Sequence, residues 1–252
     1  MSAPVVAGAA AIVRQYLAEG FYPGGARGGG VRHAASGPLV KALLIGGAQP
    51  LLGYAGGRTV PVAAPSGVQG WGRVSLADSL PLAAQGAATV PNMQFVDLAE
   101  LSQQGQEHIY CVTAAASAPL TATLVWHDPA ADPSTDGALL VNDLDLEVRV
   151  AALGGLTLHS RGAGAADRVN NVERVRLEVP PAGQLVVAVR AHRLMAAQAY
   201  ALVLQGAFDG LLQSAQNPAL KGGGAPHPRP APTRSPTLAA VRPSHMPPMM
   251  LR

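Results

Sequence analysis

A row of acidic side chains in the middle of the sequence is the first feature that could do chemistry. The stretch L-V-N-D-L-D-L, residues 140–146, places Asp143 and Asp145 at alternate positions, and Glu147 follows. In a β-strand these side chains share one face, about 7 Å apart, while Leu144, Leu146 and Val148 share the other. Calcium takes several hard oxygen ligands. The candidate structural calcium site therefore consists of Asp128, Asp143 and Asp145, with Asn142 as a further contributor. The alternative is a solvated polar face whose carboxylates pair with Arg149, Arg174 or Arg176.

A serine near the start of the chain raises the question of nucleophilic catalysis. A serine hydroxyl becomes a nucleophile only beside a base that an acid orients, and no such partners lie near Ser2 in the sequence. We therefore interpret Ser2 as a helix-capping or packing residue. His127 and Asp128 are adjacent, but neighbouring residues of a strand point to opposite faces, so they cannot form a catalytic pair. We assign no catalytic residue to this chain.

Two smaller polar groups are predicted to be structural. Asn170, Asn171 and Glu173 are expected to form a turn and hydrogen bonds at a sheet edge. Gln69 and Arg73 are expected to hold the glycine-rich turn around Trp71 by hydrogen bonds. The sequence contains no P-loop, dinucleotide-binding fingerprint or Cys/His zinc pattern, so no cofactor is required for chemistry.

Helix patterns dominate residues 1–85. Apolar residues from Val6 to Leu17 recur at helical spacing, with Pro4 in the first turn. A second helix is predicted around residues 37–48, where Leu39, Leu43 and Leu44 share one face and a Gly-Gly pair ends it.

Strand patterns dominate residues 86–208. Short apolar runs are separated by turn residues such as Asp128-Pro129, which favours an antiparallel β-sandwich. The predicted strands are 108–113, 121–126, 139–150, 155–159, 172–179, 184–191 and 199–205.

The last segment, residues 209–252, is rich in proline and glycine and lacks periodicity, so it is predicted to be a disordered tail.

The chain of 252 residues has 18 basic and 15 acidic residues. Five of the basic residues lie beyond residue 210, so the rest holds 13 basic against 15 acidic residues. The basic charge therefore belongs to the tail and does not indicate nucleic-acid binding. No apolar run is long enough to predict a membrane span.

The first residues of the chain resemble a known catalytic motif. M-S-A-P-V-V-A-G is similar to the nucleophile motif of subtilisin-like serine proteases (subtilases, peptidase family S8), G-T-S-M-[AS]-[TSA]-P-x-V-A-G. The matching residues are Met1, Ser2, Ala3, Pro4, Val6, Ala7 and Gly8. In that family the nucleophilic serine comes immediately before the methionine, so Ser2 matches the small-residue position after it. The resemblance implies that the nucleophile, its histidine and its aspartate lie upstream of Met1.

The resemblance continues through much of the chain. Residues 37–48 and the stretch G-V-Q-G-W-G-R-V, 67–74, look like the end of a subtilase catalytic domain. The stretches T-L-V-W-H-D (123–128), L-V-N-D-L-D-L (140–146) and N-N-V-E-R (170–174) together resemble the C-terminal β-sandwich of a subgroup that includes oxidatively stable alkaline bacterial subtilases. Members of this subgroup bind structural calcium and are mostly secreted. This chain shows no signal peptide, and its compartment stays unassigned.

These observations predict an α+β fragment with three parts. Residues 1–85 are the remnant of an α/β subtilase catalytic domain, 86–208 a jelly-roll-like β-sandwich, and 209–252 the tail. We expect residues 1–85 to be exposed or poorly packed, and residues 86–208 to fold alone. The predicted function is that of a fragment of a serine-type endopeptidase, whose full-length form cleaves a protein or peptide substrate. The alternative is a non-catalytic β-sandwich module for binding or structure, with a proline-rich docking tail.

Overall fold

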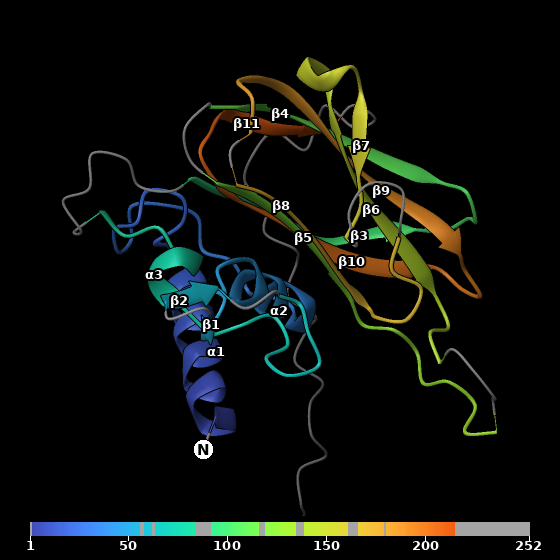
Figure 1. Ribbon diagram of the computed structural model, residues 1–252, viewed down its shortest axis with the longest axis horizontal. Coiled ribbons are helices and arrows are strands. Elements are labelled where there is room, and N and C mark those ends of the chain that lie inside the picture. Colours follow the sequence, from blue (N-terminus) through green and yellow to red (C-terminus); the bar gives the residue numbers. More distant parts are fainter. Residues whose placement is uncertain are drawn as a thin grey trace, which may run out of the picture.

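The computed structural model describes residues 2–55, 58–61, 64–83, 92–115, 119–134, 139–160, 166–178 and 180–214. Helices dominate the first part of the chain and strands the rest (Figure 1). The described elements are, in chain order, α1 (Ser2–Ala18), α2 (Gly37–Gly46), β1 (Leu52–Ala55), β2 (Arg58–Pro61), α3 (Leu76–Ser79), β3 (Asn92–Leu101), β4 (Glu107–Ala114), β5 (Leu120–Trp126), β6 (Asp143–Val150), the 3-10 turn η2 (Ala151–Leu153), β7 (Leu156–Leu158), β8 (Val172–Leu177), β9 (Gly183–Arg193), β10 (Gln198–Gly206) and β11 (Phe208–Ser214).

Two antiparallel sheets stack face to face. The first has four strands in the order β3-β10-β5-β8, and the second has five in the order β11-β4-β9-β6-β7. Strands β3 to β6 alternate between the sheets, and so do β8 to β11. This alternation is typical of a jelly-roll sandwich. The predicted antiparallel β-sandwich is therefore confirmed.

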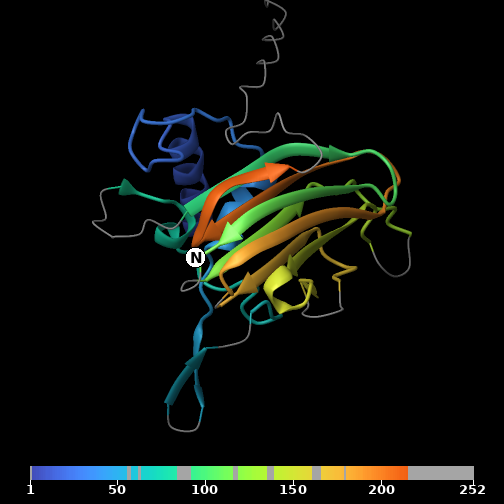
Figure 2. The same cartoon turned by 90° about the horizontal axis from the view of Figure 1, so that it is seen from above.

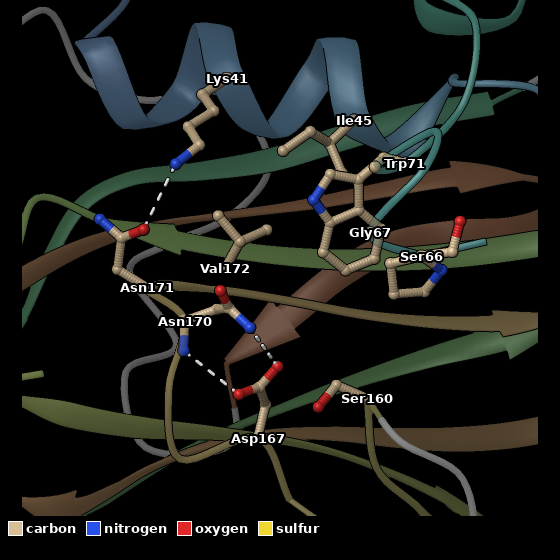
Figure 3. Close-up of a pocket in the computed structure, with 12 residues that line it drawn as sticks. Lys41, Ile45, Ser66, Gly67, Trp71, Ser160, Asp167, Asn170, Asn171 and Val172 are labelled. Atoms are coloured by element: carbon tan, nitrogen blue, oxygen red, sulfur yellow. Dashed lines mark hydrogen bonds between the residues drawn. The ribbon is translucent and has the colours of Figure 1, made fainter. Parts of the chain in front are cut away.

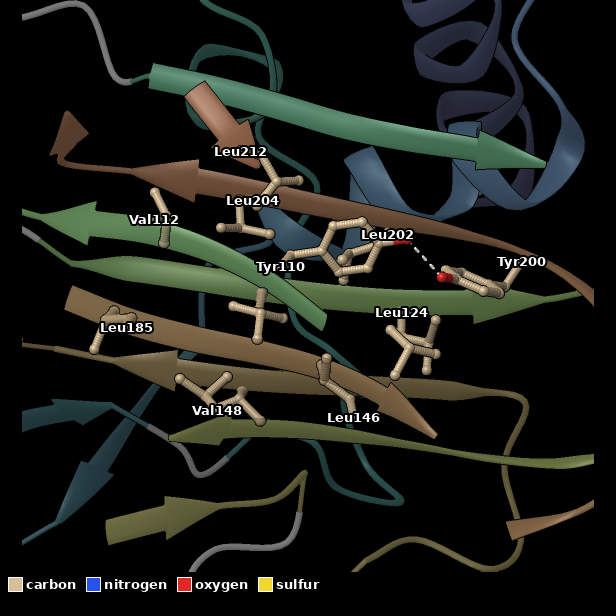
Figure 4. Packing of buried hydrophobic residues seen from close by; sticks show 14 of the residues in the cluster. Tyr110, Val112, Leu124, Leu146, Val148, Leu185, Tyr200, Leu202, Leu204 and Leu212 are labelled. Carbon is tan, nitrogen blue, oxygen red and sulfur yellow. Dashed lines mark hydrogen bonds between the residues drawn. The ribbon is translucent and has the colours of Figure 1, made fainter. Parts of the chain in front are cut away.

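The inner faces of both sheets bury one continuous apolar core (Figure 4). Leu144, Leu146 and Val148 of β6 have no exposed surface, which confirms the predicted alternation along this strand. The hydroxyls of Tyr110 in β4 and Tyr200 in β10 lie 2.7 Å apart and form a hydrogen bond between the sheets. The sandwich core is thus apolar but contains a buried polar link across it.

Helix α2 covers the outer face of the four-stranded sheet (Figures 1 and 2). The Ser36 side chain caps it by accepting a hydrogen bond from the Leu39 amide at 3.1 Å, and Pro38 occupies its first turn. The buried face of α2 packs against β5 and β10 in a second core cluster, to which Leu39, Leu43, Val125, Ala201 and Val203 belong.

The prediction that residues 1–85 are exposed or poorly packed is wrong for α2 and for the second half of α1. Val13 and Leu17 are fully buried in the same cluster as α2. The prediction is correct for the first half of α1, where Val5 and Val6 are 67% and 41% exposed. Only one end of α1 therefore finds apolar partners among the described residues.

One predicted boundary needs correction. The predicted tail began at residue 209, but β11 extends through Ser214 and pairs with β4. Strand β3 and the β1–β2 hairpin were not predicted. The seven predicted strands are confirmed as β4 to β10, with shifts at their ends. Residues 215–252 lie outside the described residues, and their disorder stays a prediction.

The glycine-rich turn around Trp71 is held as predicted. Gln69 accepts a hydrogen bond from the Leu51 amide at 2.8 Å, and the backbone of Arg73 pairs with Gln49. Gly72 has a φ of 109°, and a Cβ there would lie 2.2 Å from the Gln49 carbonyl oxygen. Only glycine fits this position.

Gly46 is expected to be essential for the contact of α2 with the sheet. A Cβ at this position would lie 1.9 Å from Oε1 of Gln205, a buried side chain that donates hydrogen bonds to the carbonyls of Leu43 and Ser79. Gly46→Ala should therefore lower the free energy of unfolding by about 1–3 kcal/mol, measured by urea denaturation.

Gly8→Ala is the matched control, because a Cβ on Gly8 in α1 would meet nothing within 4 Å. This change should be neutral or stabilise the helix by up to about 1 kcal/mol. Equal effects of the two substitutions would contradict the close approach at Gly46.

Candidate functional site

The residues of the subtilase-like motif form the start of α1. Ser2, Ala3, Pro4, Val6, Ala7 and Gly8 lie on its first two turns and are exposed, while Met1 lies outside the described residues. In the described part of the chain, no histidine forms a hydrogen bond with Ser2. The geometry therefore provides Ser2 with no base.

A serine, a histidine and an aspartate do meet elsewhere, where α2 begins. His33 Nε2 lies 2.8 Å from Oδ2 of Asp97, and the Ser36 hydroxyl donates to Oδ1 of Asp97 at 2.5 Å. The Ser36 amide also donates to Oδ2 at 3.1 Å. The Asp97 side chain is only 2% exposed and that of His33 11%. Burial would raise the pKa of Asp97, but the hydrogen bonds from His33 and Ser36 outweigh burial and hold it below its usual value.

This cluster lacks the order of a catalytic triad. In a triad the histidine lies between the serine and the acid, whereas here Asp97 lies between His33 and Ser36. Ser36 is also the cap of α2. We name the three residues the Asp97 latch, because Asp97 belongs to β3 and its two partners precede α2. A bulge at Leu98, whose φ is 60°, interrupts the pairing of β3 with β10 beside Asp97.

The three predicted calcium ligands do not converge. Asp143 and Asp145 both accept hydrogen bonds from Arg168, whereas Asp128 accepts from the amides of Val141 and Asn142. Burial raises the pKa of Asp143, although Arg168 opposes this rise. The described residues contain no group of three or more carboxylate, histidine or cysteine side chains that could hold a metal ion. This arrangement does not fit a calcium site on these residues, and calcium binding stays a prediction.

The arginine pairing expected as the alternative is found in part. Arg149 binds Glu147 and Glu107, but Arg168, which the sequence did not indicate, binds Asp143 and Asp145. These two aspartates are 3% and 6% exposed, so this end of the acidic row is buried rather than solvated.

Glu173 is fully buried between the two sheets. Its carboxylate accepts hydrogen bonds from the Leu146 amide of β6 at 2.5 Å, the Asp167 amide at 3.0 Å and the Ser160 hydroxyl at 3.1 Å. Burial raises the pKa of Glu173 to about 7, although the two amide hydrogen bonds oppose this rise. Glu173 therefore joins β8 to the other sheet and to Ser160 and Asp167, which precede β8 in the chain.

Asn170 and Asn171 have the predicted structural role. Asn170 donates to Asp167 at 2.7 Å, and Asn171 donates to the Trp126 carbonyl at 3.0 Å. The second contact fixes the turn before β8 to the end of β5.

The two asparagines also line a pocket of about 680 Å³ between the helical layer and the sandwich (Figure 3). We call it the junction groove. Its lining residues are Lys41, Ile45, Pro65, Ser66, Gly67, Gly70, Trp71, Ser160, Asp167, Asn170, Asn171 and Val172. Lys41 Nζ donates to the Asn171 side chain at 3.3 Å across the groove.

Arg174 of β8 adds a buried positive charge beside the groove. Its guanidinium stacks on Trp71, with Cζ 4.9 Å from the ring centre, and donates to the Ile45 carbonyl near the end of α2 at 3.0 Å. The residue is 7% exposed, and burial lowers its pKa to about 10. The groove thus contains polar groups suited to binding. In the described part of the chain, neither of its lining serines, Ser66 and Ser160, forms a hydrogen bond with a histidine.

Comparison with known proteins relates the chain to proteins named as serine proteases. Three "Serine protease/ABC transporter B family" proteins of Dictyostelium discoideum are similar to it. TagA is 27% identical over 81% of this chain, tagD 33% over 58%, and tagB 27% over 69%. The chain spans 12%, 10% and 11% of these relatives. The similarity therefore concerns a small part of each one.

No protein-family model matches the chain. A solved structure from Sulfurospirillum deleyianum aligns with 47% of this chain and 98% of its own, at 9% identity and a TM-score of 0.28. A likeness at this score carries no argument about fold or function. None of the helices in the described ranges is long and apolar enough to cross a membrane.

Proposed function

We propose that this chain is the C-terminal section of a subtilisin-like serine endopeptidase. Residues 1–85 would complete the catalytic domain, and the β-sandwich would support it. The observation that carries this proposal is the unequal packing of α1. Val13, Tyr16 and Leu17 in its second half are buried, whereas Val5 in its first half is 67% exposed. A helix with apolar residues on every side is normally buried by other elements. The described residues bury only one end of α1.

The motif at the start of α1 indicates which part of a full-length protein would bury the exposed end of this helix. The stretch S-A-P-V-V-A-G follows the nucleophile in the family that it resembles, so the serine would precede Met1 at the N-terminus of this helix. Free N–H groups and the helix dipole at that end favour the negative charge that develops on the substrate carbonyl oxygen. The relatives named as serine proteases are consistent with this role.

The role proposed for the sandwich follows from the shared core. Helix α2 buries its apolar face against β5 and β10, and the Asp97 latch fixes its start to β3. A rigid platform of this kind would hold α1 at a defined position. The catalytic part would then pack directly against the sandwich, and no flexible segment would separate the two.

The chain of 252 residues should show no serine-hydrolase reactivity. A fluorophosphonate probe should leave it unlabelled at a concentration that labels trypsin, because Ser2 lacks a base. Ser2→Ala should behave identically. Labelling of the chain that disappears in Ser2→Ala would contradict our assignment of Ser2.

The genomic sequence upstream of the Met1 codon tests the proposal itself. An in-frame G-T-S directly before Met1, with aspartate and histidine motifs further upstream, is the expected result. A stop codon in frame immediately upstream would overturn the proposal. The sandwich would then function as a non-catalytic binding module, for which the junction groove is the supporting observation.

A further inference from the structure

We propose that the junction groove binds an acidic, extended segment of a polypeptide. The choice of a polypeptide rests on the proposed function, because an endopeptidase acts on protein chains. The groove would be a subsite that holds the substrate away from the catalytic residues. The charge and shape of the groove support this proposal independently of catalysis.

Both layers of the molecule form the groove. Lys41 and Trp71 lie on the side of the helical layer, and Asn170 and Asn171 lie on the side of the sandwich (Figure 3). Gln205 and the Asp97 latch connect α2, which supplies one wall, to the sandwich, which supplies the other. A preformed groove costs little ordering on binding.

A second hollow of about 420 Å³ borders the groove. The two share Lys41, Ile45 and Trp71. The second hollow is lined mainly by apolar side chains, from α2 (Val40 and Leu44) and from α1 (Val6 and Ala10). A polar section and an apolar section therefore lie side by side. An extended peptide places alternate side chains about 7 Å apart on one face, so one can enter each section.

Three cationic side chains surround these hollows, against two carboxylates, those of Asp167 in the lining and of the buried Glu173 behind Ser160. Lys41 and Arg14 line them, and Arg174 lies buried beside Trp71. Asp167 is the carboxylate among the described lining residues, and it already accepts hydrogen bonds from Asn170 and from the Val169 amide. In the described part of the chain, Arg174 forms no ion pair with a carboxylate, so its charge contributes to the field at the groove.

The remaining donors favour a carboxylate as the bound group. The Lys41 ammonium has three donors, and the one protein acceptor described for it is the Asn171 side chain at 3.3 Å. Outside the tail, acidic residues outnumber basic ones, so this concentration of positive charge is local. A carboxylate bound to Lys41 and an apolar side chain packed against Trp71 would together occupy the polar and the apolar section.

The test is binding of a short fluorescein-labelled peptide of alternating leucine and glutamate, measured by fluorescence anisotropy with the whole chain. We expect saturable binding that weakens with added salt. Lys41→Gln should weaken it by about fivefold, as loss of one exposed ion pair does, and Lys41→Glu should weaken it further. Lys41 is exposed, so both variants should fold.

Arg190→Gln is the matched control. It removes one positive charge from an exposed position on β9 of the other sheet, and it should bind like the parent chain. Tryptophan fluorescence gives a second measurement, because Trp71 lines the groove and Trp126 lies in the core. The change on binding should disappear in Trp71→Phe.

Three results would overturn the inference. They are equal binding of the same peptide with glutamine in place of glutamate, equal losses in the Lys41 and Arg190 variants, and tighter binding of an acidic oligosaccharide or of single-stranded DNA than of the peptide. Because binding is measured without catalysis, the result is separate from the proposed function. If the chain binds the peptide but the genomic sequence contains no upstream catalytic region, the inference about the groove stands and the proposed protease function is wrong.

Discussion

Replacing Asp97 with alanine is expected to lower the free energy of unfolding by about 3 kcal/mol. The Asp97 side chain is 2% exposed and accepts hydrogen bonds from His33 and from both donors of Ser36. Its removal leaves these buried donors without an acceptor and frees the start of α2 from β3. Urea denaturation followed by circular dichroism measures the change.

Asp132→Ala is the control for the loss of an aspartate. Asp132 is exposed, and among the described residues it accepts hydrogen bonds from Ser134 in its own loop alone, so its replacement should leave the denaturation midpoint unchanged. If both substitutions had the same effect, the Asp97 latch would not connect the helical layer to the sandwich.

The pH dependence of the Asp97 variant follows from the lowered pKa of this carboxyl. Its stabilisation is fully present above the ordinary aspartate pKa of 3.8 and is lost as the pH falls through the lower pKa of the folded state. The stability difference between the parent and Asp97→Ala should therefore be constant near neutral pH and should shrink in acid.

Glu173→Gln is expected to remove a pH dependence of stability near neutrality. The pKa of Glu173 is raised by burial from 4.5 to about 7, so the folded state binds this proton more tightly than the unfolded state. The parent chain should thus lose stability as the pH rises from 4.5 to about 7, by up to about 3 kcal/mol. Thermal unfolding at a series of pH values should show a flatter profile for the variant.

Glu178→Gln serves as the control for this second substitution. Its side chain is 71% exposed and pairs with Arg176 on the surface, so the pH profile should keep the slope of the parent. A parent whose stability rises between pH 4.5 and 7, or a slope that Glu173→Gln leaves intact, would show that Glu173 is not the titrating group.

Most of the sandwich could be predicted from the sequence because its strands alternate clearly. The acidic and apolar residues of β6 face opposite sides as predicted, since the strand period is two. Strand β3 was missed because its bulge at Leu98 breaks the alternation. Strand β11 was missed because it contains a glycine and overlaps the segment that the sequence indicated as the tail.

The side-chain clusters could be predicted less well because they depend on the path of the chain in three dimensions. Asp97 lies 64 positions from His33, and no local pattern connects them. The one local signal was Ser36 before a proline-led helix, which indicates a cap but not its second partner. Arg168 reaches Asp145 because the segment before β8 folds back over β6, which strand patterns do not reveal.

The most direct test of the central claim is fluorophosphonate labelling of the polypeptide translated from the genomic reading frame that extends upstream of Met1. The proposal predicts one labelled serine, immediately before Met1 at the start of α1, and loss of both labelling and casein hydrolysis when that serine is replaced with alanine. A folded, extended polypeptide that the probe leaves unlabelled, or one labelled at a different serine, would contradict it.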